Sequence, residues 1–147
     1  MQSGALALLA GLALLLPGMA AALDYRSAGE TAVLYDAPSQ KAKPLFVIAA
    51  GTPVEAIVTL DAWVKVRDMK GDLAWIERRQ LADRRTVQVR GETAQIHAEP
   101  SESATVVFAA EPDVLFDYVA PANTGWIKVR HRGGQQGFVK TSRIWGH

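Results

Sequence analysis

Two short segments of the chain carry the same chemically useful side chains in the same order. Trp63-Val64-Lys65-Val66-Arg67 follows the pattern Trp-x-Lys-x-Arg, and Trp126-Ile127-Lys128-Val129-Arg130 repeats it. An indole stacks on sugar rings and peptide groups, and cations beside it attract carboxylates. These residues therefore indicate binding of a sugar ring or of a peptide that carries carboxylates.

No other pattern in the sequence supplies a catalytic or metal site. His97, His131 and His147 lack the spacing of metal ligands, and the sequence contains no Gly-x-Ser-x-Gly elbow, phosphate loop or dinucleotide loop. The chain has 0 cysteines, which excludes disulfides, thiolate metal sites and cysteine nucleophiles. We therefore expect a protein that is not an enzyme and that uses no cofactor or metal.

The charge balance argues against nucleic acid as a partner. A total of 16 Lys and Arg residues against 15 Asp and Glu residues gives a formal net charge of +1, far from a strongly basic surface. The densest basic cluster is formed by Arg78-Arg79 and Arg84-Arg85. It either binds an acidic polymer or partner, or belongs to a solvated linker.

The elements that must position the Trp-Lys-Arg segments occur twice. Gly29-Glu30-Thr31-Ala32 recurs as Gly91-Glu92-Thr93-Ala94, and the same spacing aligns Pro38-Ser39 with Pro100-Ser101. One inserted residue then brings the two Trp-Lys-Arg segments into alignment. The sequence therefore predicts duplication of a unit of about 60 residues, a size that can fold alone.

Both units show the pattern of short strands separated by turns. Polar and apolar residues alternate in Thr86–Arg90 and on either side of Val64 and Val66, and turn residues such as Lys70-Gly71-Asp72 follow. This pattern predicts an all-β chain of two tandem small β-barrels, each with five strands around an aliphatic interior.

The duplication also sets the expected domain boundaries. After an export segment at residues 1–22, we expect the first barrel at residues 23–83 and the second at residues 84–147. Residues 82–86 contain no Gly or Pro, so we expect a short and rigid junction between the barrels.

The order of the motifs resembles bacterial SH3 domains. Ala32-x-Leu34-Tyr35-Asp36 precedes Gly51-Thr52-x-Val54, and the Trp-x-Lys-Val segment, a tight turn and an aromatic residue follow. Gly137-Phe138-Val139-Lys140-Thr141-Ser142 is similar to the Gly-Tyr-Ile-Pro-Ser-Asn segment of SH3 domains. The resemblance implies SH3-like barrels that target the cell wall or bind other proteins.

The chain departs from SH3 domains that bind proline-rich peptides. The proline of their groove is replaced by Glu77 in the first unit and Lys140 in the second, and His97 stands where the first unit has Tyr35. Since a proline-rich helix docks into an aromatic groove, we do not expect this chain to bind PxxP peptides.

The candidate ligand site follows from alternation along the Trp-Lys-Arg strands. If the branched aliphatic residues face the core, then each Trp lies on an outer, basic face; alternatively, each Trp packs on the partner unit or on the barrel end. Trp75 and Phe138 are interpreted as structural residues of the strand that closes each barrel. The candidate ligand-binding residues are Tyr35, Trp63, Lys65, Arg67, Trp126, Lys128 and Arg130.

The resemblance and the basic Trp faces together predict the partner. Peptidoglycan, in its peptide portion, is the first candidate. The alternative is an adaptor that binds another envelope protein or a second copy of itself and has no affinity for the wall.

The N-terminus has the layout of a secretory signal peptide. Ala5–Leu16 is an uncharged apolar run, Pro17-Gly18 breaks it, and Ala20 and Ala22 fill the small positions before a cleavage site. We therefore expect cleavage after Ala22 and a periplasmic or secreted protein, although Lys and Arg are missing before the run. The alternative is an uncleaved anchor, for which the run is short.

Overall fold

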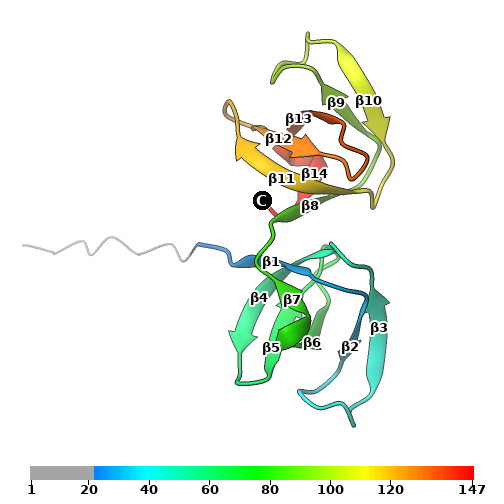
Figure 1. Ribbon diagram of the computed structural model, residues 1–147, viewed down its shortest axis with the longest axis vertical. Coiled ribbons are helices and arrows are strands. Elements are labelled where there is room, and N and C mark those ends of the chain that lie inside the picture. Colours follow the sequence, from blue (N-terminus) through cyan, green and yellow to red (C-terminus); the bar gives the residue numbers. More distant parts are fainter. Residues whose placement is uncertain (1–21) are drawn as a thin grey trace, which may run out of the picture.

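The computed structural model describes residues 22–147 and places them in two all-β units (Figure 1). Each unit is a seven-stranded antiparallel sheet that curls around its own core, which confirms the predicted pair of small SH3-like barrels. Residues 1–21, which hold most of the predicted export segment, lie outside the described residues. A helical membrane crossing needs a long apolar helix, and residues 22–147 contain none.

The first unit has the strand order β3-β2-β6-β5-β4-β1-β7. Its elements are β1 (Tyr25–Ala28), β2 (Ala32–Tyr35), β3 (Pro44–Ile48), β4 (Pro53–Thr59), β5 (Trp63–Arg67), β6 (Leu73–Glu77), the 3-10 turn η1 (Arg78–Gln80) and β7 (Leu81–Ala82).

The second unit has the equivalent order β10-β9-β13-β12-β11-β8-β14. Seven strands replace the five expected, in part because the two-residue strands β7 and β14 are too short to show any alternation in the sequence. The elements are β8 (Thr86–Val89), β9 (Ala94–His97), β10 (Val106–Ala110), β11 (Leu115–Pro121), β12 (Trp126–Arg130), β13 (Gln136–Lys140), the 3-10 turn η2 (Thr141–Arg143) and β14 (Ile144–Trp145).

The two sheets repeat each other in register as well as in order. The β2–β3 pair shifts register between Leu34 and Tyr35, and the β9–β10 pair shifts at the equivalent place, between Val106 and Phe108. The β4–β5 pair shifts between Ala56 and Val58, and the β11–β12 pair shifts between Tyr118 and Ala120. Since a bulge re-aims the side chains around it, both units present equivalent residues on equivalent faces.

The cores follow the predicted alternation. Val64 and Val66 of β5 are 3% and 1% exposed, while the Trp, Lys and Arg residues between and beside them point outward. The second core is not purely aliphatic, as the sequence had suggested. Phe116, 1% exposed, fills the position that Val54 occupies in the first core.

The two barrels are joined by three residues and by direct contacts across the joint. The Arg85 guanidinium lies over the Tyr25 ring at 5.8 Å and over the Tyr118 ring at 5.2 Å, so one cation bridges an aromatic residue of each unit. Tyr25 also meets Trp145 edge-on, with 5.2 Å between the ring centroids. These contacts agree with the short junction predicted at residues 82–86.

The C-terminal end of the second unit packs closely against the first. Gly146 is buried at a φ of 107°, and a Cβ built there would lie 2.9 Å from the Pro53 Cβ of β4. Ser27, the cross-strand partner of Pro53, donates a hydrogen bond from its hydroxyl to the Arg84 carbonyl at 2.8 Å. The joint thus leaves no room for a side chain at Gly146.

Two neighbouring core positions differ between the units, and the change in side-chain size at one offsets the change at the other. Gly137 of β13 is buried, and a Cβ there would meet the Ile96 Cγ2 at 2.5 Å and the His97 carbonyl oxygen at 2.8 Å. The first unit has Ala74 and Leu34 at the two equivalent positions. The extra Cγ2 of the β-branched Ile96 therefore occupies the space that an alanine methyl takes in the first unit.

We predict that Gly137→Ala lowers the free energy of unfolding by about 1–3 kcal/mol, because it overpacks the second core. Adding Ile96→Leu should recover part of this loss, since Leu lacks the Cγ2 at that place. Urea denaturation of wild type, both single variants and the double variant measures the coupling. A Gly137→Ala variant as stable as wild type would contradict this packing.

Candidate functional site

The outer face of the first barrel gathers three aromatic side chains around a lysine. Tyr35 of β2 and Lys65 of β5 both lie opposite Trp75 of β6, so the three side chains form a row across neighbouring strands. Trp63 lies beside the row, and its ring meets Tyr35 edge-on at 5.7 Å between centroids. All four residues are partly exposed. We call Tyr35, Trp63, Trp75 and Lys65 the aromatic face.

One edge of the aromatic face is fixed by a carboxylate. Glu77 lies opposite Trp63, accepts a hydrogen bond from the Gln40 amide at 2.6 Å, and pairs with the Arg79 guanidinium at 2.5 Å. The hydrogen bond from Arg79, and then that from Gln40, lowers the pKa of Glu77 below its ordinary value. This pairing ties the β2–β3 loop to the edge of the Trp63 ring.

The arginines of the two Trp-Lys-Arg strands, named as candidate ligand-binding residues, are both ion-paired within the fold. Arg67 contacts Glu55 at 2.9 Å, directly across from it on β4, and Glu55 is 8% exposed. Arg130 faces Asp117, the equivalent position on β11, at 3.8 Å. Both arginines therefore compensate partly buried carboxylates, and their role in ligand binding stays a prediction.

The corresponding face of the second barrel is covered by its own side chains. Trp126 is only 9% exposed, since His97 meets it edge-on at 5.2 Å and the Lys140 ammonium lies 6.0 Å from its ring centroid. Lys128 lies over the Phe138 ring at 5.9 Å. Trp126 is thus buried, but against side chains of its own barrel and not against the partner unit, whereas Trp63 is half-buried.

Lys140 is held in place by a further ion pair. Its ammonium contacts the Glu102 carboxylate from the β9–β10 loop. The same ammonium therefore interacts with the Trp126 ring and with a carboxylate. An open hollow of about 870 Å³ remains beside this cluster, between the β9–β10 loop and the β11–β12 turn. Small and polar residues line most of the hollow, and Trp126, its one aromatic residue, is only 9% exposed, unlike the rings of the aromatic face.

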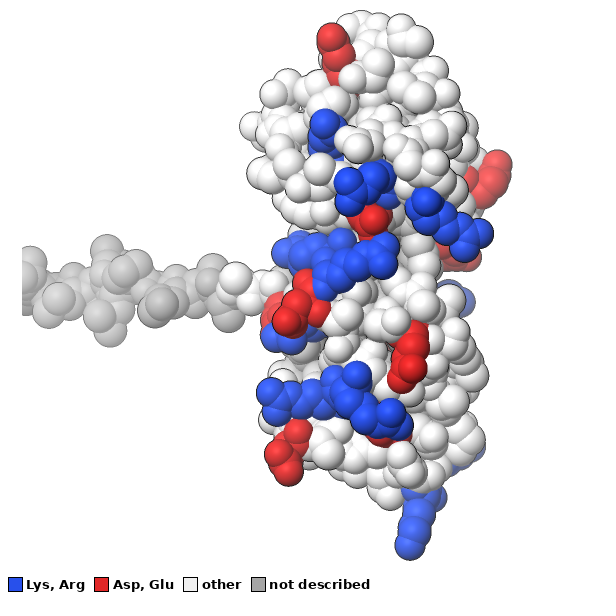
Figure 2. Space-filling view, in the orientation of Figure 1, with Lys and Arg blue, Asp and Glu red and all other residues white. Residues whose placement is uncertain are grey.

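The arginine cluster near the junction is used within the fold. Figure 2 shows Lys and Arg side chains gathered on one face across the joint, with acidic side chains between them. Arg79 pairs with Glu77, Arg84 pairs with Asp117, and Arg85 lies between two tyrosine rings. The exposed Arg79 and its pairing with Glu77 agree with a solvated linker whose arginines are balanced by nearby carboxylates, whereas Arg85, which lies over two tyrosine rings, is part of the joint.

Trp75 is the residue of the aromatic face that sequence reasoning missed. It was interpreted as structural, like Phe138, because small and aliphatic residues flank it. The same neighbours, Ala74 and Ile76, are 2% and 0% exposed, so Trp75 must point outward. Applying the alternation rule to β6 as it was applied to β5 would have placed Trp75 beside Lys65.

The fold and the aromatic face define a class of protein, namely tandem small β-barrels that present aromatic residues on an outer strand face. The family model of the bacterial SH3 domain matches residues 28–83 and again residues 90–146. The chain therefore belongs to the bacterial SH3 domain family.

Two solved structures from Trichomonas vaginalis are similar to the chain. The structures of NlpC2 and NlpC1 share 15% and 16% sequence identity with it, at TM-scores of 0.38 and 0.39. The matches cover 84% and 91% of this chain but 48% and 50% of those proteins, so the chain spans about half of their length. No curated protein matches the sequence.

We predict that the Glu77 pairing makes stability depend on pH. Because the folded-state pKa of Glu77 is lowered, its contribution is present above the ordinary value of 4.5 and is lost as the pH falls through the folded-state pKa. The stability difference between wild type and Glu77→Gln should therefore be larger at pH 7 than at pH 3. Urea denaturation at the two pH values measures it.

Arg79→Gln serves as the matched variant, since Arg79 supplies the largest part of the pKa shift. It should remove most of the pH-dependent gain that Glu77→Gln removes. An equal stability difference between wild type and Glu77→Gln at both pH values would show that the pairing does not form in solution.

Proposed function

We propose that the protein is an exported, non-enzymatic binding module of the cell envelope, and that it recognises the peptide portion of peptidoglycan through the aromatic face of its first barrel. Membership of the bacterial SH3 domain family supports a role as a binding module. The wall ligand and the envelope location are inferences from the chemistry of the aromatic face and from the N-terminal sequence.

The difference between the two barrels carries the proposal. The first has three partly exposed aromatic rings around Lys65, and in residues 22–147 this lysine has no ion-pair partner. In the second barrel, Trp126 is buried beneath His97 and Lys140, and Lys128 lies over the partly exposed Phe138 ring. A ligand can therefore stack on the first barrel without displacing a side chain.

The chemistry of the aromatic face suits a peptide that bears carboxylates. Flat aromatic surfaces take up peptide planes and apolar side chains, and an ammonium group contributes one positive charge that neutralises one carboxylate. Glu77 at the edge of the face disfavours a second acidic group near Trp63. We propose binding without bond cleavage, because no motif in the sequence supplies a nucleophile and its base.

Export accounts for how such a module would reach the wall. The apolar run Ala5–Leu16, the break at Pro17-Gly18 and the small residues Ala20 and Ala22 support secretion with cleavage before Leu23. N-terminal sequencing of protein recovered from the cell envelope tests this step.

We predict that purified protein sediments with insoluble peptidoglycan, and that Trp63→Ala and Trp75→Ala each reduce the bound fraction at least about tenfold. Loss of one stacked ring at a binding hot spot is expected to weaken the free energy of binding by about 2 kcal/mol or more, which is more than tenfold in affinity. Lys65→Gln should weaken binding mainly at low salt, since it removes one exposed charge. Sedimentation at two salt concentrations measures both effects.

Phe138→Ala is the matched control, because Phe138 is the counterpart of Trp75 on the covered face. It should sediment like wild type, and thermal unfolding should show that all variants are folded. Wild-type protein that remains in the supernatant at low salt would refute wall binding. Equal loss with Phe138→Ala would refute the assignment to the first barrel.

A second candidate function is docking to another protein or to a second copy. The outermost strands expose apolar side chains: Leu45 and Val47 of β3 are 42% and 62% exposed, and Val106 and Val107 of β10 are 42% and 47% exposed. An unpaired strand edge with apolar residues favours association. If this function is correct, light scattering should show a defined complex that Val47→Lys disrupts. A monomer at all concentrations, with no partner in crosslinked envelope extracts, would contradict it.

A further inference from the structure

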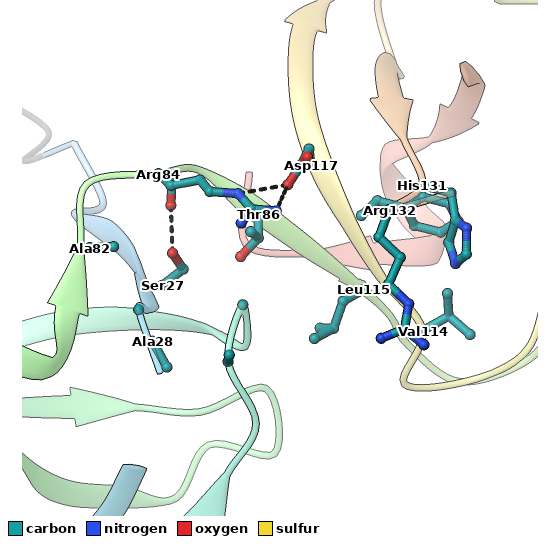
Figure 3. Close-up of a pocket in the computed structure, with 14 residues that line it drawn as sticks. Ser27, Ala28, Ala82, Arg84, Thr86, Val114, Leu115, Asp117, His131 and Arg132 are labelled. Carbon is teal, nitrogen blue, oxygen red and sulfur yellow. Dashed lines mark hydrogen bonds and ion pairs between the residues drawn. The ribbon is translucent and has the colours of Figure 1, made fainter. Parts of the chain in front are cut away.

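A cleft lies between the two barrels, away from the aromatic face. Its volume is about 500 Å³, and both units supply its walls (Figure 3). The first barrel contributes small residues, among them Ala28, Ala50 and Ala82, and the second contributes Val114 and Leu115. The small residues on one wall leave room for a ligand side chain against Val114 and Leu115 on the other.

The cleft also carries an excess of positive charge. Two arginines line it, Arg84 and Arg132, against one carboxylate, that of Asp117. Asp117 is already neutralised, since it pairs with Arg84 and faces Arg130 at 3.8 Å. Arg132 is exposed and, among residues 22–147, has no ion-pair partner. In Figure 3 its side chain extends toward the part of the cleft that Val114 and Leu115 line.

A buried polar group in the cleft lining also indicates a site for a polar ligand. Thr86 lines the cleft and is 2% exposed, and its hydroxyl has no hydrogen-bond partner among the described residues. Buried hydroxyls in proteins are nearly always paired with protein or water, so an unpaired hydroxyl in the lining is an exception that a polar group entering the cleft would satisfy once the side chain turns toward it. Thr86 follows directly on Arg85, the residue that the two tyrosine rings hold in place.

The walls of the cleft are positioned before any ligand arrives. The Ser27 hydroxyl bonds to the Arg84 carbonyl, and Arg84 in turn pairs with Asp117, so a chain of contacts connects β1 to β11 across the cleft (Figure 3). A preformed site loses less entropy on binding than one that must close. The cleft therefore exists only because the two barrels are docked, and neither barrel forms it alone.

From these observations we propose that the interbarrel cleft is a second binding site, and that it takes the C-terminal carboxylate of a short peptide that ends in a small apolar residue. Arg132 pairs with the carboxylate, and the alanines and Leu115 enclose the terminal side chain. The choice of wall peptides as the source of such ends rests on the proposed function, whereas the cleft and its carboxylate chemistry do not.

Titration of the whole protein with acetyl-D-alanyl-D-alanine, followed by NMR, tests the proposal. Saturable shifts of the Thr86, Val114 and Leu115 amide signals are expected, and the same dipeptide with a C-terminal amide should bind at least about tenfold more weakly, since it lacks the charge. Arg132→Gln should weaken binding of the acid about tenfold and leave the thermal unfolding temperature unchanged, because the side chain is exposed.

Two further variants complete the test. Arg143→Gln, which removes an exposed arginine outside the cleft, should bind like wild type. Ala50→Trp, which fills the cleft from an exposed position, should abolish binding. No saturable shift at the cleft residues, equal binding of the acid and the amide, or an unaffected Arg132→Gln variant would each overturn the proposal.

The outcomes also separate this proposal from the proposed function. Wild type that sediments with peptidoglycan in a Trp63-dependent way, but shows no shift in the cleft with the dipeptide, refutes the cleft alone. Dipeptide binding in the cleft by a protein that does not sediment refutes the wall function and leaves the cleft site in place.

Discussion

The contact between Arg85 and two tyrosine rings is the interaction on which the arrangement of the molecule depends. Tyr25 belongs to the first barrel and Tyr118 to the second, so a single guanidinium joins the units from inside the junction. Burial raises the pKa of the Tyr25 hydroxyl, and Glu55 raises it further, against the opposing effect of Arg85. This joint therefore determines which residues of the two barrels line the cleft between them.

Duplication followed by divergence explains why the two barrels differ on their outer faces. The registers and bulges of the sheets are equivalent, so both units place the same positions on the outer face. Besides His97 in place of Tyr35 and Phe138 in place of Trp75, the charge opposite the tryptophan is reversed between them. Glu77 pairs with Gln40 and Arg79. Lys140 instead lies over the Trp126 ring and pairs with Glu102. One copy stays open, and the other is closed by its own lysines.

Much of this architecture was predictable from the sequence, because strand alternation and internal repetition are local properties. They established two barrels, the inward valines and the outward Trp63 and Lys65. They could not establish what loops and neighbouring strands lay over a face. The pairing of Arg67 with Glu55 depends on register across a bulge, and the burial of Trp126 depends on a lysine from β13 and a loop carboxylate. The cleft could not be predicted from the sequence for the same reason, because it is formed by residues of both units.

The central claim is that the two barrels move as one body, held by the arginine between the tyrosines. Residual dipolar couplings measured for backbone amides in both units, in one weakly aligned sample, test this directly. The account predicts that a single alignment tensor fits the couplings of residues 25–82 and 86–145 together. Two tensors of clearly different magnitude would show that the barrels reorient independently, and the joint described here would then not exist in solution.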